Sequence, residues 1–319
     1  MELNEFLNKI LEHEYHITVS GTVRMRSVVG ILSEQGAFVL KKIEGYPSMN
    51  RITQLAEVLE KLQEKDVPVA PLLRTRKGKA FVRIGDLFWI VQPWIKGHHC
   101  DFSNKEERLA SVRSIARMHQ TPVALPAPSQ NYLWTPPLDE KYGARLERCK
   151  RILHAERLPI KISSLWIKEA ESAIVRLQGN DYKQALKKDR ERGTVCHRDL
   201  APHNLIYKDR TAYLIDFDIA GIDVRAHDLY QVINHALFLN GWCERTVADI
   251  LRTYQKVAPL CEANHKLLRT LFTYPALLLR EVYEYRKEKE RDSDKWRTRL
   301  EWTLAIEEQR REWIHKGGF

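Results

Sequence analysis

The stretch VCHRDLAPHNLIY, residues 195–207, and the stretch AYLIDFDIAG, residues 212–221, decide the predicted fold. In the first, HRDLAPHN is too polar and too short for a helix, and Pro202 blocks helix continuation, whereas the apolar residues 205–207 indicate a strand. The second contains an apolar strand over residues 213–215 that ends on Asp216-Phe217-Asp218. The two stretches are therefore predicted to form a hairpin that presents polar groups at one end.

The order of polar residues in this hairpin fits phosphoryl transfer. In that reaction a protein positions ATP, magnesium and an acceptor hydroxyl, and it stabilises charge on the moving phosphoryl group. Magnesium prefers oxygen ligands, which Asn204 and Asp216 can supply from adjacent strands. Asp199 is then free to orient the acceptor hydroxyl and accept its proton, and His197 would brace the loop. The alternative is an ordinary hairpin with Asp and Asn as turn formers, but turn chemistry requires no such order of residues.

HRDLAPHN matches the catalytic-loop pattern H-R-D-L-x-x-x-N of kinases at every specified position. The chain resembles the protein-kinase-like superfamily, on the side of the aminoglycoside phosphotransferases and choline kinases. Eukaryotic-type protein kinases carry D-F-G, an activation loop and A-P-E. This chain has Asp216-Phe217-Asp218 instead, and Asp228 follows only twelve positions after Asp216, which leaves no room for a long activation segment.

Within that branch, five stretches are most similar to the CotS-type spore coat proteins of endospore-forming bacteria: HRDLAPHNLIY, YLIDFD, HDLYQVI, FVLKKI and VQPWIKG. The resemblance covers most of the chain and implies a two-lobed α+β fold of the protein-kinase type. Residues 1–95 would form a small antiparallel-sheet lobe that binds nucleotide, and residues 96–319 a mostly helical lobe with the catalytic loop and the acceptor site. ATP and magnesium are the implied cofactors, a hydroxyl compound the implied acceptor, and other spore coat proteins the implied partners.

The resemblance also assigns roles in the first lobe. FVLKKI, residues 38–43, resembles the V-A-I-K strand, which places Lys41 on the α- and β-phosphates of the nucleotide. Lys42 would point to the opposite face of the strand. In the helix predicted over residues 48–65, Glu57 stands where relatives have the glutamate that holds this lysine, and Glu60 is the alternative.

The glycine-rich loop of kinases is a poor match. The strands predicted over residues 17–23 and 25–33 contain Gly21 and Gly30, which do not make G-x-G-x-x-G. Either Ser20, Arg24 or Ser27 contacts the phosphates, or nucleotide binding is weakened. A structural coat protein that keeps the fold without turnover is therefore the rival interpretation, and the intact set of Lys41, Asp199, Asn204 and Asp216 opposes it.

VQPWIKG, residues 91–97, resembles the hinge between the lobes. Relatives recognise adenine there through the backbone, which implies contacts from the Pro93 carbonyl and from the amide and carbonyl of Ile95. A proline loses nothing where only a carbonyl is needed. Helices predicted over residues 139–154 and 162–188 insert where relatives build the acceptor pocket, and Tyr132 and Trp134 either line that pocket or belong to the core.

Two further acidic residues receive roles from the resemblance. Asp228, in HDLYQVI, stands where relatives brace the catalytic loop from the following helix. Asp218 lies two positions after the metal-binding Asp216, where some small-molecule kinases have a second acidic metal ligand.

The composition argues against several other classes of protein. The chain of 319 residues is 44% hydrophobic and 29% charged, which is ordinary for a soluble globular protein. Its first residues lack the features of a signal peptide, and no run approaches eighteen apolar residues, so no membrane span is expected. The five cysteines are scattered, which favours reduced thiols in a cytoplasm-like compartment. The resemblance to spore coat proteins implies the mother-cell cytoplasm and the spore coat. The net charge of +10 is spread among acidic residues without a recognisable binding module, which disfavours nucleic acid.

Overall fold

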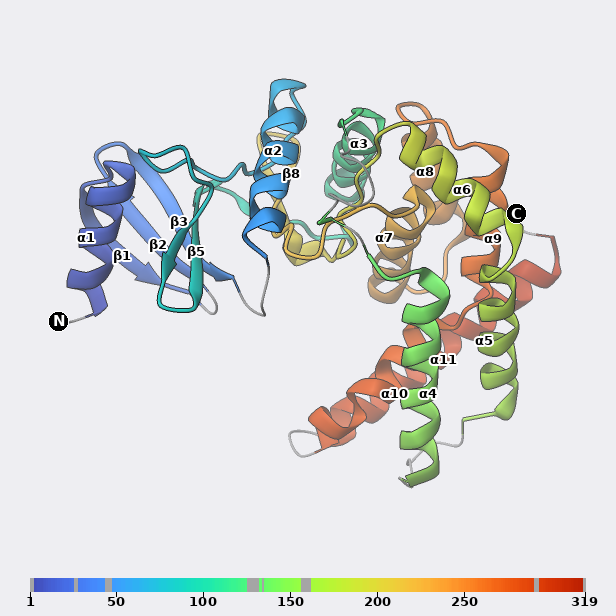
Figure 1. Cartoon of the computed structure of the whole chain (residues 1–319). Helices are drawn as coiled ribbons and strands as arrows, with labels where there is room; N and C mark the ends of the chain where they lie inside the picture. The colour runs from blue at the N-terminus through green and yellow to red at the C-terminus, as the bar shows by residue number, and fades with distance from the viewer. Residues whose placement is uncertain are drawn as a thin grey trace.

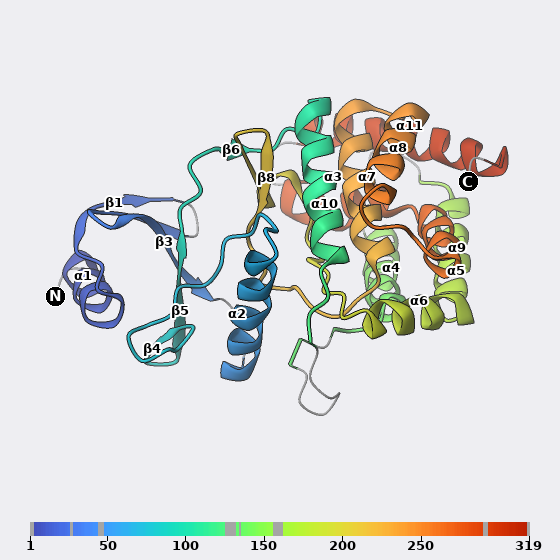
Figure 2. The same cartoon turned by 90° about the horizontal axis from the view of Figure 1, so that it is seen from above.

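The computed structural model describes residues 3–25, 28–43, 48–124, 132–133, 135–155, 162–289 and 293–317. Ser27 and Trp134 lie outside these ranges. An antiparallel sheet forms the N-terminal part and helices form most of the remainder (Figures 1 and 2). The predicted α+β architecture is thereby confirmed.

The first sheet has the strand order β1-β2-β3-β5-β4, and every neighbouring pair is antiparallel. A turn with Gly36 at φ +133° joins β2 to β3, a conformation that favours glycine. Helix α1 contributes Leu11 to a small apolar cluster with Ile31 and Leu40 of the sheet. These elements are α1 (Leu3–Tyr15), β1 (Val19–Arg24), β2 (Val28–Ser33), β3 (Gly36–Ile43), β4 (Val82–Ile84) and β5 (Leu87–Pro93).

Helix α2 (Met49–Glu64) connects the sheet to the helical part. Ser48 caps it, because its hydroxyl accepts a hydrogen bond from the Arg51 amide at 3.1 Å. The buried face of α2 joins the main hydrophobic core, which continues into the helical part. The chain after α2 then pairs with β8, where the Leu214 amide donates to the Pro68 carbonyl at 2.8 Å. The predicted boundary between two lobes near residue 95 therefore stays a prediction, because α2 and the segment after it contact residues on both sides of that boundary.

The hairpin that follows HRDLAPHN forms as predicted and lies in a second sheet, of order β6-β7-β8. Strands β7 (Leu205–Lys208) and β8 (Thr211–Leu214) are joined by a turn in which Asp209 and Arg210 both have positive φ, as the type I′ two-residue hairpin loop requires. The short strand β6 (His98–His99) was not expected and pairs with β7. It approaches so closely that a side chain at Gly97 would meet the Tyr207 carbonyl.

Helix α7 (Arg225–Asn240), most of whose side chains are buried, packs against α3, α8, α9, α10 and α11. The prediction of one helix over residues 162–188 is wrong. These residues form α5 and most of α6, which are separated at the extended Gly179. Further along, α9 and α10 are separated near Pro275, which lacks the amide hydrogen a continuous helix needs. Helix α4 packs beside α10, and α10 beside α11 (Figure 1). The helices are α3 (Lys105–Gln120), α4 (Leu138–Ala155), α5 (Ser164–Leu177), α6 (Asn180–Glu191), α8 (Glu244–Gln255), α9 (Glu262–Phe272), α10 (Ala276–Lys289) and α11 (Ser293–His315).

Candidate active site

The polar end of the hairpin brings Asp199 and Asn204 together. Asp199 is exposed, whereas Asn204 is only 2% exposed. The Asn204 side-chain amide donates to the Asp199 carbonyl oxygen at 2.8 Å and to its carboxylate at 3.0 Å. This orientation leaves the amide oxygen as the Asn204 group that can ligate a cation.

Lys41 lies between two carboxylates of the neighbouring segment. Its ammonium group is 2.6 Å from Asp216 Oδ1 and 2.8 Å from Asp218 Oδ2, and its side chain is 12% exposed. Burial would lower the pKa of Lys41, but Asp218 and Asp216 outweigh that effect and raise it. Burial raises the pKa of Asp218, and the negative charge of Asp216 adds to the rise against the opposing effect of Lys41. Two carboxylates share one ammonium group, so the three side chains carry a net negative charge that suits a divalent cation.

The expected pair of Lys41 and Glu57 is not formed. Glu57 is exposed on α2, and its charge acts on Arg74, whereas Glu60 pairs with Arg74 at 2.6 Å. The physical reason is that Asp216 and Asp218 already neutralise Lys41 from across the site, leaving Glu57 in solvent.

Asp228 lies at the start of α7 and holds the catalytic loop by its backbone. Its carboxylate accepts hydrogen bonds from the His197 amide at 2.7 Å and the Arg198 amide at 2.9 Å. Burial alone would raise the pKa of Asp228, but the hydrogen bond from His119 and the neighbouring imidazoles lower it to about 2. The His197 ring in turn lies 2.8 Å from the Ile215 carbonyl oxygen, which ties the catalytic loop to the strand that precedes Asp216.

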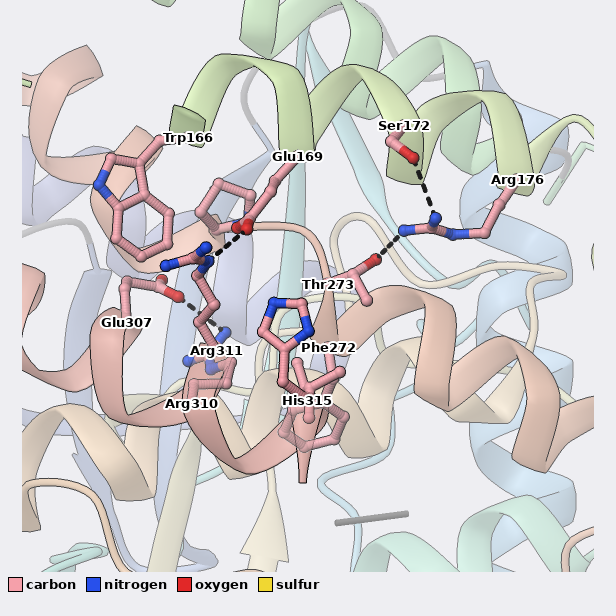
Figure 3. A pocket seen from close by; sticks show the side chains of 12 residues that line it. Trp166, Glu169, Ser172, Arg176, Phe272, Thr273, Glu307, Arg310, Arg311 and His315 are labelled. Atoms are coloured by element: carbon pink, nitrogen blue, oxygen red, sulfur yellow. Dashed lines mark hydrogen bonds and ion pairs between the residues drawn. The ribbon is translucent and has the colours of Figure 1, made fainter. Parts of the chain in front are cut away.

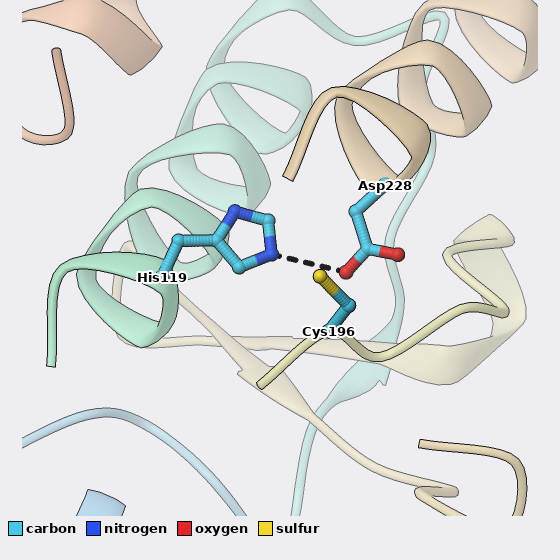
Figure 4. Close-up of side chains that lie close together, drawn as sticks. All are labelled: His119, Cys196 and Asp228. Carbon is cyan, nitrogen blue, oxygen red and sulfur yellow. Dashed lines mark hydrogen bonds and ion pairs between the residues drawn. The ribbon is translucent and has the colours of Figure 1, made fainter. Parts of the chain in front are cut away.

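Behind the loop, His119, Cys196 and Asp228 form a buried cluster whose potential ligand atoms all lie within 4.8 Å of one another (Figure 4). A metal site would require a thiolate, but burial raises the pKa of Cys196 well above its usual value, and its thiol donates to the Asp223 carbonyl at 3.3 Å. His119 contacts Asp228 at 3.0 Å and the Tyr254 hydroxyl at 2.7 Å. These hydrogen bonds explain the cluster as support for the catalytic loop.

Sequence reasoning missed two arginines that shape the site. Arg198 has a φ of +70°, an unfavourable conformation for its side chain, and is held by Asp223 at 2.9 Å and by Gln231, which donates to its carbonyl at 2.8 Å. Arg51 on α2 donates to the carbonyls of Asp218 and Ala220 at 3.1 and 2.7 Å. Arg198 belongs to the H-R-D pattern, but its partners are distant in the chain, so the pattern alone does not show what holds it. Arg51 has no local signal, because it stands in an ordinary amphipathic helix.

The hinge begins at the end of β5, whose last residue is Pro93. Pro93 pairs with Phe38 of β3, the Trp94 amide donates to the Ala37 carbonyl at 2.9 Å, and Ile95 is partly exposed. The contacts of Pro93 and Ile95 with adenine remain a prediction. Tyr132 is 42% exposed, so it is not a core residue.

A cavity of about 210 Å³ lies elsewhere, between α5, α11 and the link from α9 to α10 (Figure 3). Its wall includes Trp166, Phe272 and the ion pair of Arg311 with Glu169 at 2.7 Å. The predicted catalytic and nucleotide-binding residues are not part of this wall.

Residues 26–260 match the phosphotransferase enzyme family, and the chain belongs to that family. Among individual relatives, it is similar to spore coat protein S of Bacillus subtilis (strain 168), with 19% identity over 98% of this chain and 93% of the relative. It is also 28% identical to homoserine kinase of Pseudomonas aeruginosa (strain LESB58), over 67% of this chain and 60% of that enzyme.

Solved structures share the fold. An aminoglycoside phosphotransferase from Alicyclobacillus acidocaldarius superposes with a TM-score of 0.73 and 17% identity, covering 93% of each chain. Amicoumacin kinase in complex with AMP-PNP, Ca²⁺ and Ami has a TM-score of 0.68 and 17% identity, covering 97% of this chain and 94% of that one. The protein-kinase-like fold is thereby confirmed. In the part of the chain that the structure describes, no helix combines the length and apolarity needed to span a membrane.

Proposed function

We propose that this protein transfers the γ-phosphoryl group of ATP to a hydroxyl acceptor, with magnesium as cofactor. The observation that carries the proposal is the convergence of Lys41, from β3, with Asp199, Asn204 and Asp216, which flank the hairpin, at one end of that hairpin. The phosphotransferase family of the chain supports the same reaction.

The donor set fits magnesium. The carboxylates of Asp216 and Asp218 and the amide oxygen of Asn204 are oxygen ligands, and the carboxylates exceed the single ammonium group by one charge. These three residues would hold the ion, which when bound neutralises charge on the phosphates.

Asp199 performs the proton step. Its exposed carboxylate accepts the hydrogen of the acceptor hydroxyl while the hydroxyl oxygen bonds to the γ-phosphorus. The bond between that phosphorus and the bridging oxygen breaks, ADP leaves, and the proton remains on Asp199 until solvent removes it. The hydrogen bonds from the Asn204 amide fix the carboxylate for this role.

Lys41 contacts the α- and β-phosphates. In the structure its ammonium group is bound to Asp216 and Asp218, so phosphate and cation together must replace those ion pairs. Nucleotide and magnesium are therefore expected to bind cooperatively. The phosphates take over the ammonium group of Lys41, and the cation takes over the carboxylates of Asp216 and Asp218 that the ammonium group leaves.

A structural role in the spore coat is the second candidate. Spore coat protein S is a near full-length relative, and the β1–β2 region lacks the glycine-rich motif. On this view the protein would reside in the mother-cell cytoplasm and the coat and bind other coat proteins without turnover.

Thermal unfolding with ATP, with and without magnesium, tests the nucleotide site that phosphoryl transfer requires. A ligand at about a hundred times its dissociation constant adds roughly 2.7 kcal/mol of stability. We expect a magnesium-dependent rise in the wild type that Asp216→Asn abolishes. Asp209→Asn is the matched control, since Asp209 lies exposed in the turn at the other end of the same hairpin. If saturating ATP does not raise the stability of the wild type, the structural role in the spore coat is the candidate that remains.

A further inference from the structure

The indole ring of Trp94 packs against strand β2 at Gly30, which has no side chain. A methyl group added at Gly30 would overlap the Trp94 ring, lying 2.9 Å from its Cη2 atom and 3.1 Å from its Cε3 atom. Gly30 is not among the glycines with positive φ, so its backbone does not itself require glycine. Gly30 is needed for space: the Trp94 ring packs directly on the strand.

The register of the sheet shows which face the ring occupies. Gly30 pairs with Val39, and Val28 pairs with Lys41, and directly paired or alternate residues share one face of a sheet. On β5, Ile90 pairs with Lys41, so Trp94, four positions further on, continues the same alternation. Lys41 reaches Asp216 from this face. The Trp94 ring therefore lies on the face of the sheet that carries Lys41. The ring packs on Gly30, which is paired two positions along the strand from Lys41, a distance of about 7 Å.

This position matches the path of a nucleotide. Under the proposed function, on which this inference rests, the phosphates reach Lys41 and the base lies at the hinge beside Pro93 and Ile95. Trp94 stands between those two hinge residues in the chain, and its ring extends from the hinge over β2. A flat apolar ring on this path is suited to a flat aromatic base.

We propose that Trp94 is the stacking surface for the purine base of the nucleotide and that Gly30 is the residue that admits it. Stacking of a base on an aromatic side chain corresponds to about a 5- to 150-fold gain in affinity. This gain offsets the missing glycine-rich loop, because the base contributes affinity that the phosphate contacts do not.

The test compares two ligands by calorimetry in the presence of magnesium. ATP carries the base, whereas tripolyphosphate has only the phosphates that meet Lys41. We expect Trp94→Leu to weaken ATP binding at least fivefold and to leave tripolyphosphate binding unchanged. Trp94→Phe, which keeps a ring, should retain most of the affinity. Trp302→Leu is the control, because Trp302 is 44% exposed on α11.

Gly30 supplies an independent arm. Gly30→Ala should weaken ATP binding by displacing the ring, and the double variant Gly30→Ala with Trp94→Leu should bind ATP no more weakly than Trp94→Leu alone. Unfolding midpoints without ligand establish that each variant is folded. An unchanged ATP affinity in Trp94→Leu overturns the inference. Tighter ATP binding in that variant also overturns it, because it shows that the indole ring occupies the place of the base. If the wild type binds tripolyphosphate and ATP equally, the stacking role of Trp94 is overturned but the proposed function is not. If the wild type binds neither ligand, the proposed function is overturned as well.

Discussion

Replacement of Asp228 by Asn tests the support of the catalytic loop. Asp228 is fully buried and accepts hydrogen bonds from the amides of His197 and Arg198 and from His119. Its pKa falls from 3.8 to about 2 on folding. Each pKa unit corresponds to about 1.4 kcal/mol, so the ionised carboxylate contributes roughly 2.5 kcal/mol of stability at pH 7.

The sign of this contribution sets its pH dependence. Because the folded-state pKa is lowered, the stabilisation is fully present above the unfolded value and is lost as pH falls through about 2. The Asn variant retains the shape but places an amide near groups that already donate hydrogen bonds. We therefore expect the variant to be at least 2.5 kcal/mol less stable at neutral pH, with a difference from wild type that narrows below about pH 4.

Urea unfolding between pH 7 and pH 3.5 measures both quantities. Asp294→Asn is the matched control, since Asp294 is also an acidic residue in the first turn of a helix but is exposed. A loss no larger than that of the control, or a difference that stays constant with pH, would refute the reasoning. Activity of the folded variant should also fall, because two catalytic-loop amides lose an ionised acceptor.

Three further predictions concern the site. Asp199→Asn should bind ATP normally and lose transfer by roughly 10²- to 10⁴-fold in an ATP-consumption assay; full turnover would remove Asp199 as the base. Lys41→Met should weaken ATP binding yet tighten magnesium binding measured without nucleotide, since Asp216 and Asp218 lose their competing cation; weaker magnesium binding would contradict this. Glu57→Gln should leave ATP affinity unchanged in calorimetry, because Glu57 is exposed and does not hold Lys41; a tenfold loss would restore the pairing that the family resemblance implies.

Much of this protein can be predicted from the sequence because the decisive signals are local. Pro202, the apolar runs and the order of polar residues specify the catalytic hairpin within about twenty residues, and the structure contains that hairpin. The helix that begins at Arg225 and carries Asp228 follows the hairpin closely in the chain, so it too can be predicted from a local pattern. The helix predicted over residues 162–188 is broken at Gly179, so there the periodicity of apolar residues predicted a continuity that the local glycine signal contradicted.

Tertiary structure alone decided which charges and rings meet. Lys41 and Asp216 are 175 positions apart, so no local pattern shows that Lys41 binds the carboxylates of that segment rather than Glu57 on the neighbouring helix. The contact of Trp94 with Gly30 likewise depends on strand register and on the path of the hinge. Sequence specifies local conformation through backbone sterics and hydrophobic periodicity, whereas partner choice at the site depends on distances that only the packed elements define.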